Sequence, residues 1–188
     1  MKNIEIITLS QKNISDFARE RNLLLSKAKS NWVFFLDSDE QISPAEPDLA
    51  MLDNDFAGYK ILRKNYFLGD YVGSEYLTRL AKKDAGKWFR RVHETWEVKG
   101  KVGRIDNPFI IHNTTENLFD YIKKINFYST LHARANKEEG KKSGLFKIAV
   151  YPILKFVQGL ARSKHLVFSL MQSFHSFLSW SKLYFLRS

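Results

Sequence analysis

The chain has 188 residues, enough for one domain or for one domain with a tail, and its 44% hydrophobic and 14% aromatic content excludes global disorder. It contains no cysteine, which excludes disulfides and thiolate metal sites, so any metal must bind oxygen or imidazole. The net charge of +10 is concentrated after Glu139, beyond which no Asp or Glu occurs, and it implies a polyanionic partner: a membrane surface or a nucleic acid.

The N-terminal part follows the pattern of an α/β fold. It lacks the basic and apolar regions of a secretory signal, and Ile4–Leu9 predicts a short strand. A helix is expected over about residues 16–29, with Asn13 or Ser15 as its N-cap. The apolar run Val33–Leu36 then predicts a buried strand of a parallel sheet, and ligands bind beyond the carboxyl ends of such strands.

The middle of the chain predicts more strands and one long helix. Phe56–Leu62 and Tyr76–Leu80 are strand candidates, and the turn-rich segment Asn65–Gly73 between them is expected to be a loop. Phe109–Ile111 is another short apolar run. Apolar residues recur at helical spacing over Asn117–Asn136, which predicts a helix.

The C-terminal part predicts an amphipathic helix. His165–Ser181 contains no charged residue, and its serines and its large apolar side chains fall on opposite stripes of a helix. Such a helix is more apt to lie on a membrane than to cross it, although packing on the domain's own core is the alternative. We therefore expect a domain over residues 1–140 and a basic, aromatic-rich, membrane-associating tail over residues 141–188.

The acidic turn Asp37-Ser38-Asp39-Glu40 follows the predicted buried strand and is the main candidate for chemistry. Two carboxylates one residue apart can reach a divalent cation and a sugar-donor hydroxyl together, and Mg²⁺ or Mn²⁺ bound by oxygen ligands can neutralise a departing diphosphate. A D-x-D pair alone is a weak indication, because acidic turns after strands are common. Its place behind a helix that carries Arg21 and Asn22 makes it much stronger.

An ordered series of motifs resembles family 2 glycosyltransferases, and especially the branch that includes lipopolysaccharide core glucosyltransferases. The resemblance spans roughly residues 16–140. The motifs that carry it are Phe17-Ala18-Arg19-Glu20-Arg21-Asn22, Ala28, Trp32-Val33-Phe34-Phe35-Leu36-Asp37-Ser38-Asp39-Glu40, Asn65-Tyr66-Phe67-Leu68-Gly69, Thr78-Arg79-Leu80, Val92-His93-Glu94, Gly100-Lys101-Val102-Gly103, Ile111-His112-Asn113-Thr114 and Tyr121-Ile122-Lys123-Lys124-Ile125-Asn126.

The resemblance implies a partial GT-A fold, with a mixed sheet flanked by helices, and a nucleotide-sugar donor. It implies that Asp39 ligates the metal and that Asp37 contacts the donor ribose, the sugar or a metal-bound water. It places Glu94 as the general base that takes the proton from the acceptor hydroxyl. The alternative for Glu94 is a surface carboxylate paired with Arg90 or Arg91.

Other candidates keep two interpretations each. His112 ends an apolar run and is expected either to ligate the metal or to be a hydrogen-bonded histidine near the core. Arg21 and Asn22 could approach the donor diphosphate, although Arg21 could equally form a surface salt bridge. Trp88 and Trp96 flank the proposed base and could stack on an acceptor sugar, but aromatic residues are more often part of a core.

The chain departs from the family pattern at its start, since the strand-helix-strand that binds the donor base is not expected within it. The leading hypothesis is an inverting glycosyltransferase that acts on a cell-envelope glycan or lipid-linked acceptor, peripheral to the cytoplasmic membrane at its inner, anionic face. The alternative is a catalytically incomplete module that docks on a membrane or on a partner transferase chain. Nucleic-acid binding is disfavoured, because no recognised binding motif accompanies the basic charge.

Overall fold

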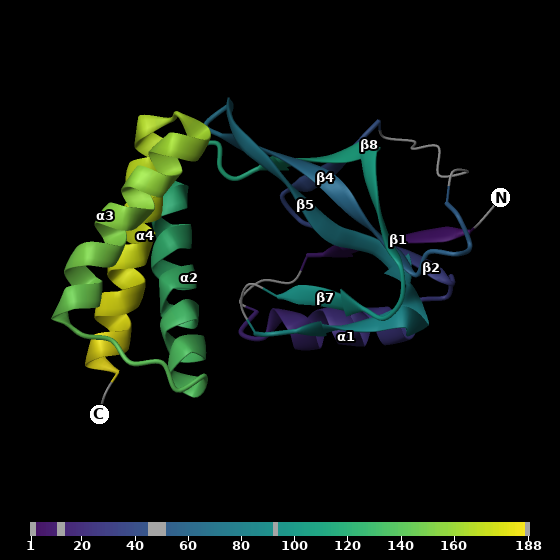
Figure 1. Cartoon of the computed structure of the whole chain (residues 1–188), viewed down its shortest axis with the longest axis horizontal. Helices are drawn as coiled ribbons and strands as arrows, with labels where there is room; N and C mark the ends of the chain where they lie inside the picture. The colour runs from purple at the N-terminus through teal and green to yellow at the C-terminus, as the bar shows by residue number, and fades with distance from the viewer. Residues whose placement is uncertain (1–2, 11–13, 45–51, 92–93, 187–188) are drawn as a thin grey trace. The chain divides into compact units, whose positions relative to one another are not determined.

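A computed structural model describes residues 3–10, 14–44, 52–91 and 94–186. The chain forms two compact units. The first consists of Met1–Asn65 with Ser74–His112, and the second of Tyr66–Gly73 with Asn113–Ser188. Both units are drawn in Figure 1.

A mixed sheet of six strands, in the order β1-β2-β5-β4-β8-β3, forms the centre of the first unit. β1 pairs parallel with β2, whereas β2 pairs antiparallel with β5 and β3 pairs antiparallel with β8. Helix α1 packs on a separate hairpin formed by β6 and β7 (Figure 1). The elements are β1 Ile4–Leu9, α1 Phe17–Lys27, β2 Trp32–Asp37, β3 Glu40–Ser43, β4 Gly58–Phe67, β5 Asp70–Lys82, a 3₁₀ turn Lys83–Ala85, β6 Gly86–Phe89, β7 Thr95–Val98 and β8 Val102–Asn113.

Strand β2 is buried on both faces, which confirms the strand predicted over Val33–Leu36. Alternate side chains of the strand point to opposite faces of a sheet. Trp32, Phe34 and Leu36 join one apolar core, while Val33 and Phe35 join the other, which lies under α1 and the β6–β7 hairpin. The carboxyl end of β2 is therefore held from both sides.

Two local predictions were wrong. The N-cap of α1 is Asp16, whose side chain accepts a hydrogen bond from the Arg19 amide, rather than Asn13 or Ser15; Asn13 lies outside the described residues. The loop expected over Asn65–Gly73 is a tight hairpin turn at Leu68 and Gly69, with φ values of 52° and 88°. Positive φ at both central residues lets β4 and β5 continue up to the turn.

The second unit consists of three helices and the tip of the β4–β5 hairpin. Figure 1 shows α2 (Leu118–Glu138), α3 (Leu145–Ser163) and α4 (Leu166–Phe185) side by side. Phe67 and Val72 from the hairpin pack with Tyr121 and Ile125 of α2, and Phe168, Met171 and Leu178 of α4 cover them. Burial raises the pKa of Tyr121 to about 12. This core joins α2 to the C-terminal helices within the second compact unit, which comprises Tyr66–Gly73 and Asn113–Ser188.

Helix α4 divides its large apolar side chains between two faces, whereas the sequence predicted a single apolar stripe. Its serines Ser169, Ser176 and Ser179 are buried against neighbouring helices. The large apolar side chains divide: Met171 and Leu178 pack on the α2 core, whereas Val167, Leu170, Phe174 and Phe177 are exposed. Among the described residues, no helix has the length and apolar character needed to cross a membrane.

Candidate functional site

The acidic turn connects β2 to β3 at the carboxyl end of β2. Asp37 is the last residue of β2, and Glu40 is the first of β3. The Glu40 carboxylate closes the turn by accepting a hydrogen bond of 2.9 Å from the Asp37 amide. The predicted strand-then-acidic-turn arrangement is therefore present: Asp37 directly precedes the two-residue turn Ser38-Asp39, and Asp39 is its second residue.

A buried guanidinium links the first acid of this turn to Glu94. Arg21 of α1 is 0% exposed; its Nη2 atom donates to Asp37 Oδ1, and its Nε atom donates to Glu94 Oε1 over 3.0 Å. The ring centre of Trp88 lies 4.5 Å from Arg21 Cζ, so the cation also stacks on an aromatic face. Glu94 is thus paired with the buried Arg21, whereas the alternative from the sequence was a surface pairing with Arg90 or Arg91.

Arg79 of β5 binds the other side of the turn and was not singled out from the sequence. Its Nη2 atom donates to Asp37 Oδ2 over 2.7 Å and to Glu40 Oε1 over 3.1 Å. Burial acts to raise the pKa of Asp37, but the charges of Arg79 and Arg21 outweigh it and hold that pKa below its usual value. The Asp37 carboxylate is therefore kept ionised and fixed by two cations.

The charge network continues beyond the turn. Arg63 donates to Glu40 Oε1 over 2.8 Å and to Glu75 Oε1 over 2.6 Å. Acidic and basic groups thus alternate from Glu94 through Arg21, Asp37, Arg79, Glu40 and Arg63 to Glu75. A buried charge is tolerated when each neighbour has the opposite sign, and this alternation satisfies that condition.

The second acid of the turn faces His112. The register of β3 and β8 places Glu40 opposite His112, and Asp39 Oδ2 lies 3.5 Å from His112 Nε2. His112 Nδ1 lies 2.8 Å from Asn65 Oδ1, while the Asn65 amide donates to Glu75 over 3.2 Å. With Asn65 Oδ1 as the acceptor, His112 Nδ1 donates this hydrogen bond, and Nε2 is the ring nitrogen that faces Asp39.

The residues present fit a divalent cation in part. Within the described ranges, no group of three or more His, Asp or Glu side chains is arranged to enclose a metal. Asp39 and His112 supply one oxygen and one imidazole nitrogen, and the bond to Asn65 orients the imidazole as an outer partner of a metal ligand would. A cation that accepts one imidazole besides carboxylate and completes its shell with substrate phosphate oxygens and water, such as Mn²⁺, fits this pair better than Mg²⁺, which prefers oxygen ligands.

Three other sequence candidates have structural roles here. Both polar atoms of the Asn22 amide bond the backbone of Trp88, each over 2.9 Å, and so attach β6 to α1. Trp88 and Trp96 are buried and stack with ring centres 5.3 Å apart, which makes them core residues rather than an exposed platform for an acceptor sugar. His93 lies outside the described residues.

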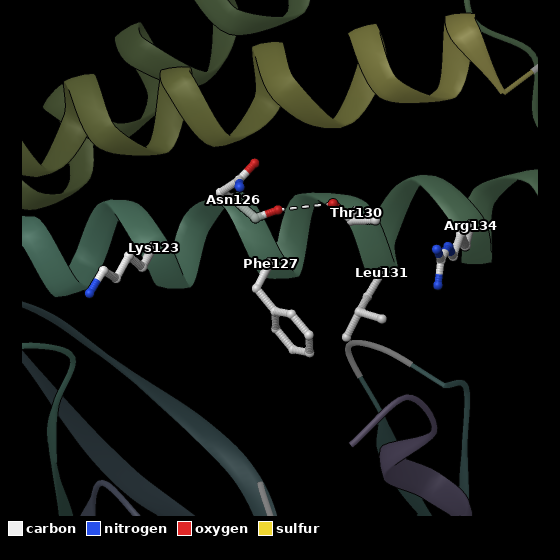
Figure 2. A pocket seen from close by; sticks show the side chains of 6 residues that line it. All are labelled: Lys123, Asn126, Phe127, Thr130, Leu131 and Arg134. Carbon is white, nitrogen blue, oxygen red and sulfur yellow. Dashed lines mark hydrogen bonds between the residues drawn. The ribbon is translucent and has the colours of Figure 1, made fainter. Parts of the chain in front are cut away.

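The second unit contains a hollow of about 410 Å³ on the surface of α2. Figure 2 shows Phe127 and Leu131 projecting to one side of the helix, with Lys123 and Arg134 at the two ends. Asn126 and Thr130 complete the lining and are joined by a hydrogen bond of 3.0 Å. The lining includes no carboxylate, and none of the residues proposed from the sequence for the site lines it.

The chain is similar to a curated protein named lipopolysaccharide core biosynthesis glycosyltransferase LpsC, from Rhizobium meliloti (strain 1021). The two are 26% identical over 153 residues, which cover 76% of this chain and 57% of the relative. The chain thus spans less than two thirds of that relative's length. No model of a known protein family matches the chain. The mixed sheet and the four α-helices of the described residues are compatible with part of a nucleotide-sugar transferase fold.

Proposed function

We propose that the first unit carries out metal-dependent glycosyl transfer from a nucleotide-sugar donor to a cell-envelope glycan or a lipid-linked acceptor. The proposal assigns the chain to the GT-A type of family 2 and gives the transfer an inverting course. Its support is the similarity to a lipopolysaccharide core glycosyltransferase together with the carboxylates gathered around the turn after β2. The proposal places the reaction at the inner face of the cytoplasmic membrane.

The observation that carries the proposal is the bridging position of Arg21. One buried guanidinium binds both Asp37, the first acid of the turn, and Glu94, the proposed base, although the two acids are far apart in sequence. Groups held in fixed mutual geometry can act on one substrate without reorganising. A solvated acidic loop would show no such shared cation.

In the proposed donor site, Asp39 and His112 would hold a Mg²⁺ or Mn²⁺ ion, which would supply positive charge to stabilise the departing diphosphate. Asp37 remains ionised beside Arg21 and Arg79 and accepts a hydrogen bond from a donor ribose or sugar hydroxyl. We leave Asn22 out of the donor site, because its amide is bonded to the backbone of Trp88.

Glu94 acts as the general base. Its side chain is only 14% exposed, and Arg21 fixes it through Oε1, so the acceptor hydroxyl is assigned to Oε2. As the acceptor oxygen bonds to the anomeric carbon, its proton passes to Glu94 and the bond between that carbon and the diphosphate breaks. A single displacement of this kind inverts the anomeric centre.

The test is nucleotide-sugar binding and turnover by the purified full chain, measured by calorimetry and by release of nucleoside diphosphate with and without Mn²⁺. We expect Asp39→Asn to weaken Mn²⁺-dependent binding at least about tenfold. Glu94→Gln should retain binding but lose turnover by about a hundredfold or more. Asp84→Asn, an exposed acid-to-amide change in the 3₁₀ turn, is the matched control and should change neither. Equal behaviour of Asp39→Asn and Asp84→Asn would refute the metal-site assignment.

A further inference from the structure

Arg63 of β4 binds two carboxylates that belong to different parts of the candidate site. Its Nη1 atom donates to Glu40 Oε1 over 2.8 Å, and its Nη2 atom donates to Glu75 Oε1 over 2.6 Å. The Arg63 side chain is 16% exposed, and that of Glu40 is fully buried. Because the nitrogens of a planar guanidinium have a fixed separation, Arg63 also fixes the two carboxylates relative to each other.

Glu40 connects Arg63 to the acidic turn. While its Oε1 atom accepts from Arg63, its Oε2 atom accepts the hydrogen bond of 2.9 Å from the Asp37 amide that closes the turn. The Glu40 side chain therefore fixes the start of the two-residue turn Ser38-Asp39. We call Arg63, Glu40 and this turn the turn arm.

Glu75 connects Arg63 to His112 through Asn65. Glu75 Oε1 accepts from Asn65 Nδ2 over 3.2 Å, and Asn65 Oδ1 lies 2.8 Å from His112 Nδ1. Burial acts to raise the pKa of Glu75, but the charge of Arg63 outweighs it and holds that pKa below its usual value, so the carboxylate stays ionised and only accepts. It thereby turns the amide nitrogen of Asn65 toward Glu75 and the amide oxygen toward His112. We call Arg63, Glu75, Asn65 and His112 the histidine arm.

The order of the strands brings the two arms to one place. The neighbouring strands β5, β4, β8 and β3 carry, in this order, Glu75, then Arg63 with Asn65, then His112, and then Glu40. Arg63 and Asn65 are two residues apart on β4 and so share a face of the sheet, and the register places Glu40 directly opposite His112. The arms leave Arg63 separately and meet again where Asp39 Oδ2 lies 3.5 Å from His112 Nε2.

We propose that Arg63 is a positioning residue that holds Asp39 and His112 facing each other, so that both can ligate one divalent cation. The use of that cation rests on the proposed function, whereas the positioning is a property of the metal-free chain. Arg63 acts on Asp39 through Glu40, and it acts on His112 through Glu75 and Asn65. Removing an outer partner of a metal ligand typically lowers metal affinity by about ten- to a hundredfold.

The first test measures Mn²⁺ binding to the full chain by electron paramagnetic resonance of the free ion. Arg63→Met removes the guanidinium that joins the two arms, and we expect Mn²⁺ affinity to fall at least about tenfold. Arg104→Met is the matched control, because it removes an exposed arginine of β8 outside both arms, and it should change the affinity by less than about twofold. Equal Mn²⁺ affinities of the two variants would overturn the proposal. Absence of Mn²⁺ binding by the wild type would refute the metal site of the proposed function, and the second test then decides on the positioning alone.

The second test observes His112 in the metal-free chain by nitrogen-15 nuclear magnetic resonance, with His112→Gln identifying its signals among those of the five histidines. In the wild type, the Nδ1 proton should give a resolved signal, because the hydrogen bond to Asn65 slows its exchange with water. We expect Arg63→Met to abolish this signal, although Asn65 and His112 are themselves unchanged. Arg104→Met should retain it.

Glu75→Ala covers the case in which Arg63→Met fails to fold. The Glu75 side chain is 47% exposed, so its removal should be tolerated while it releases the Asn65 amide. We expect loss of the His112 Nδ1 signal and weaker Mn²⁺ binding. Glu97→Ala removes an exposed carboxylate from β7 and should retain both. A Glu75→Ala chain that keeps the Nδ1 signal would overturn the proposal, because His112 would then be oriented without the histidine arm.

Discussion

Arg21 is a fully buried cation whose charge is balanced by two carboxylates and by the face of Trp88. The sequence allowed us to propose Arg21, Asp37, Asp39, Glu94 and His112 individually, because acids after strands and an Arg-Asn pair on a helix are visible as patterns. It did not show that Arg21 joins Asp37 to Glu94. That pairing depends on where the β6–β7 hairpin places Glu94, which no local pattern records.

Arg79 was missed for a related reason. It stands in the strand candidate Tyr76–Leu80, where an isolated arginine in a half-buried strand is ordinarily an outward-facing residue. Its role depends on the antiparallel register of β2 and β5, which pairs Phe34 with Leu80 and so brings Arg79 near Asp37. The buried Glu40 and the partly buried Asp37 require compensating cations, and two acids next to a predicted buried strand were the sequence signal for that requirement.

Replacing Arg21 should destabilise the first unit strongly. Arg21→Met keeps the length of the side chain but leaves Glu94 and part of Asp37 without a counter-charge, and we expect a loss of about 3 kcal/mol in the free energy of unfolding. The free energy of unfolding is measured by urea denaturation, with tryptophan fluorescence as the signal, since Trp32, Trp88 and Trp96 lie in this unit. Arg19→Met, at an exposed position of the same helix, should change it by less than about 0.5 kcal/mol. Similar losses from both would contradict the charge-network interpretation.

The stability that Asp37 provides should depend on pH. Arg79 and Arg21 hold its pKa in the folded protein below the unfolded value of about 3.9, so the ionised group stabilises the fold fully above that pH. The contribution is lost as pH falls from about 3.9 through the lower folded pKa. The difference in urea midpoint between wild type and Asp37→Asn should therefore be constant near neutrality and shrink below about pH 4. A difference that does not change on acidification would contradict this assignment.

At the scale of elements, the strands and helices with strong periodicity were predicted well. β1, β2 and the long helix α2 appear within two residues of the expected bounds. The turn at Leu68 and Gly69 was missed, because Asn, Asp and Gly near it suggested a longer loop. The division of the large apolar side chains of α4 between the α2 core and the exposed surface could not be predicted, since helical periodicity shows that two faces differ but not which one faces a neighbour.

The β6–β7 hairpin supports the site because it carries Trp88 under Arg21. Its two strands approach tightly at Gly86, where an added Cβ would lie 2.1 Å from the Glu97 carbonyl oxygen. Gly86→Ala should therefore force the strands apart and lower the free energy of unfolding by about 1 to 3 kcal/mol. Lys87→Ala, at the next and exposed position of the same strand, should be nearly neutral. The urea midpoints of the two variants test this prediction. A Gly86→Ala variant as stable as the wild type would contradict the close approach of β6 and β7.

At the scale of the whole molecule, the two compact units are interleaved along the chain. The hairpin tip Tyr66–Gly73 belongs with the C-terminal helices, although it lies between segments of the first unit. Phe67 contacts Tyr121 and Phe168, with ring centres 5.0 Å and 5.4 Å apart. The sequence suggested a separable tail because composition changes after Glu139, but composition does not reveal that α4 covers a core formed by the hairpin and α2.

A chain that ends at residue 140 tests this division. Removing α3 and α4 uncovers Phe67, Tyr121 and Ile125, which are nearly completely buried in the full chain. We expect the amides of α2 to lose most of their protection from hydrogen exchange, because an isolated amphipathic helix is marginally stable in water. The amides of β2 and β5 should stay protected, since their cores contain no residue beyond Ile110.

The protection of α2 in the shortened chain distinguishes a division into the two compact units from a division at residue 140. Loss of protection in α2 with retention in β2 means that stability follows the compact units, and that residues 141–188 complete a core. Full protection of α2 in the shortened chain would mean that residues 1–140 form a self-sufficient domain, as the composition suggests. In that case Phe168, Met171 and Leu178 would be dispensable for the core that they cover.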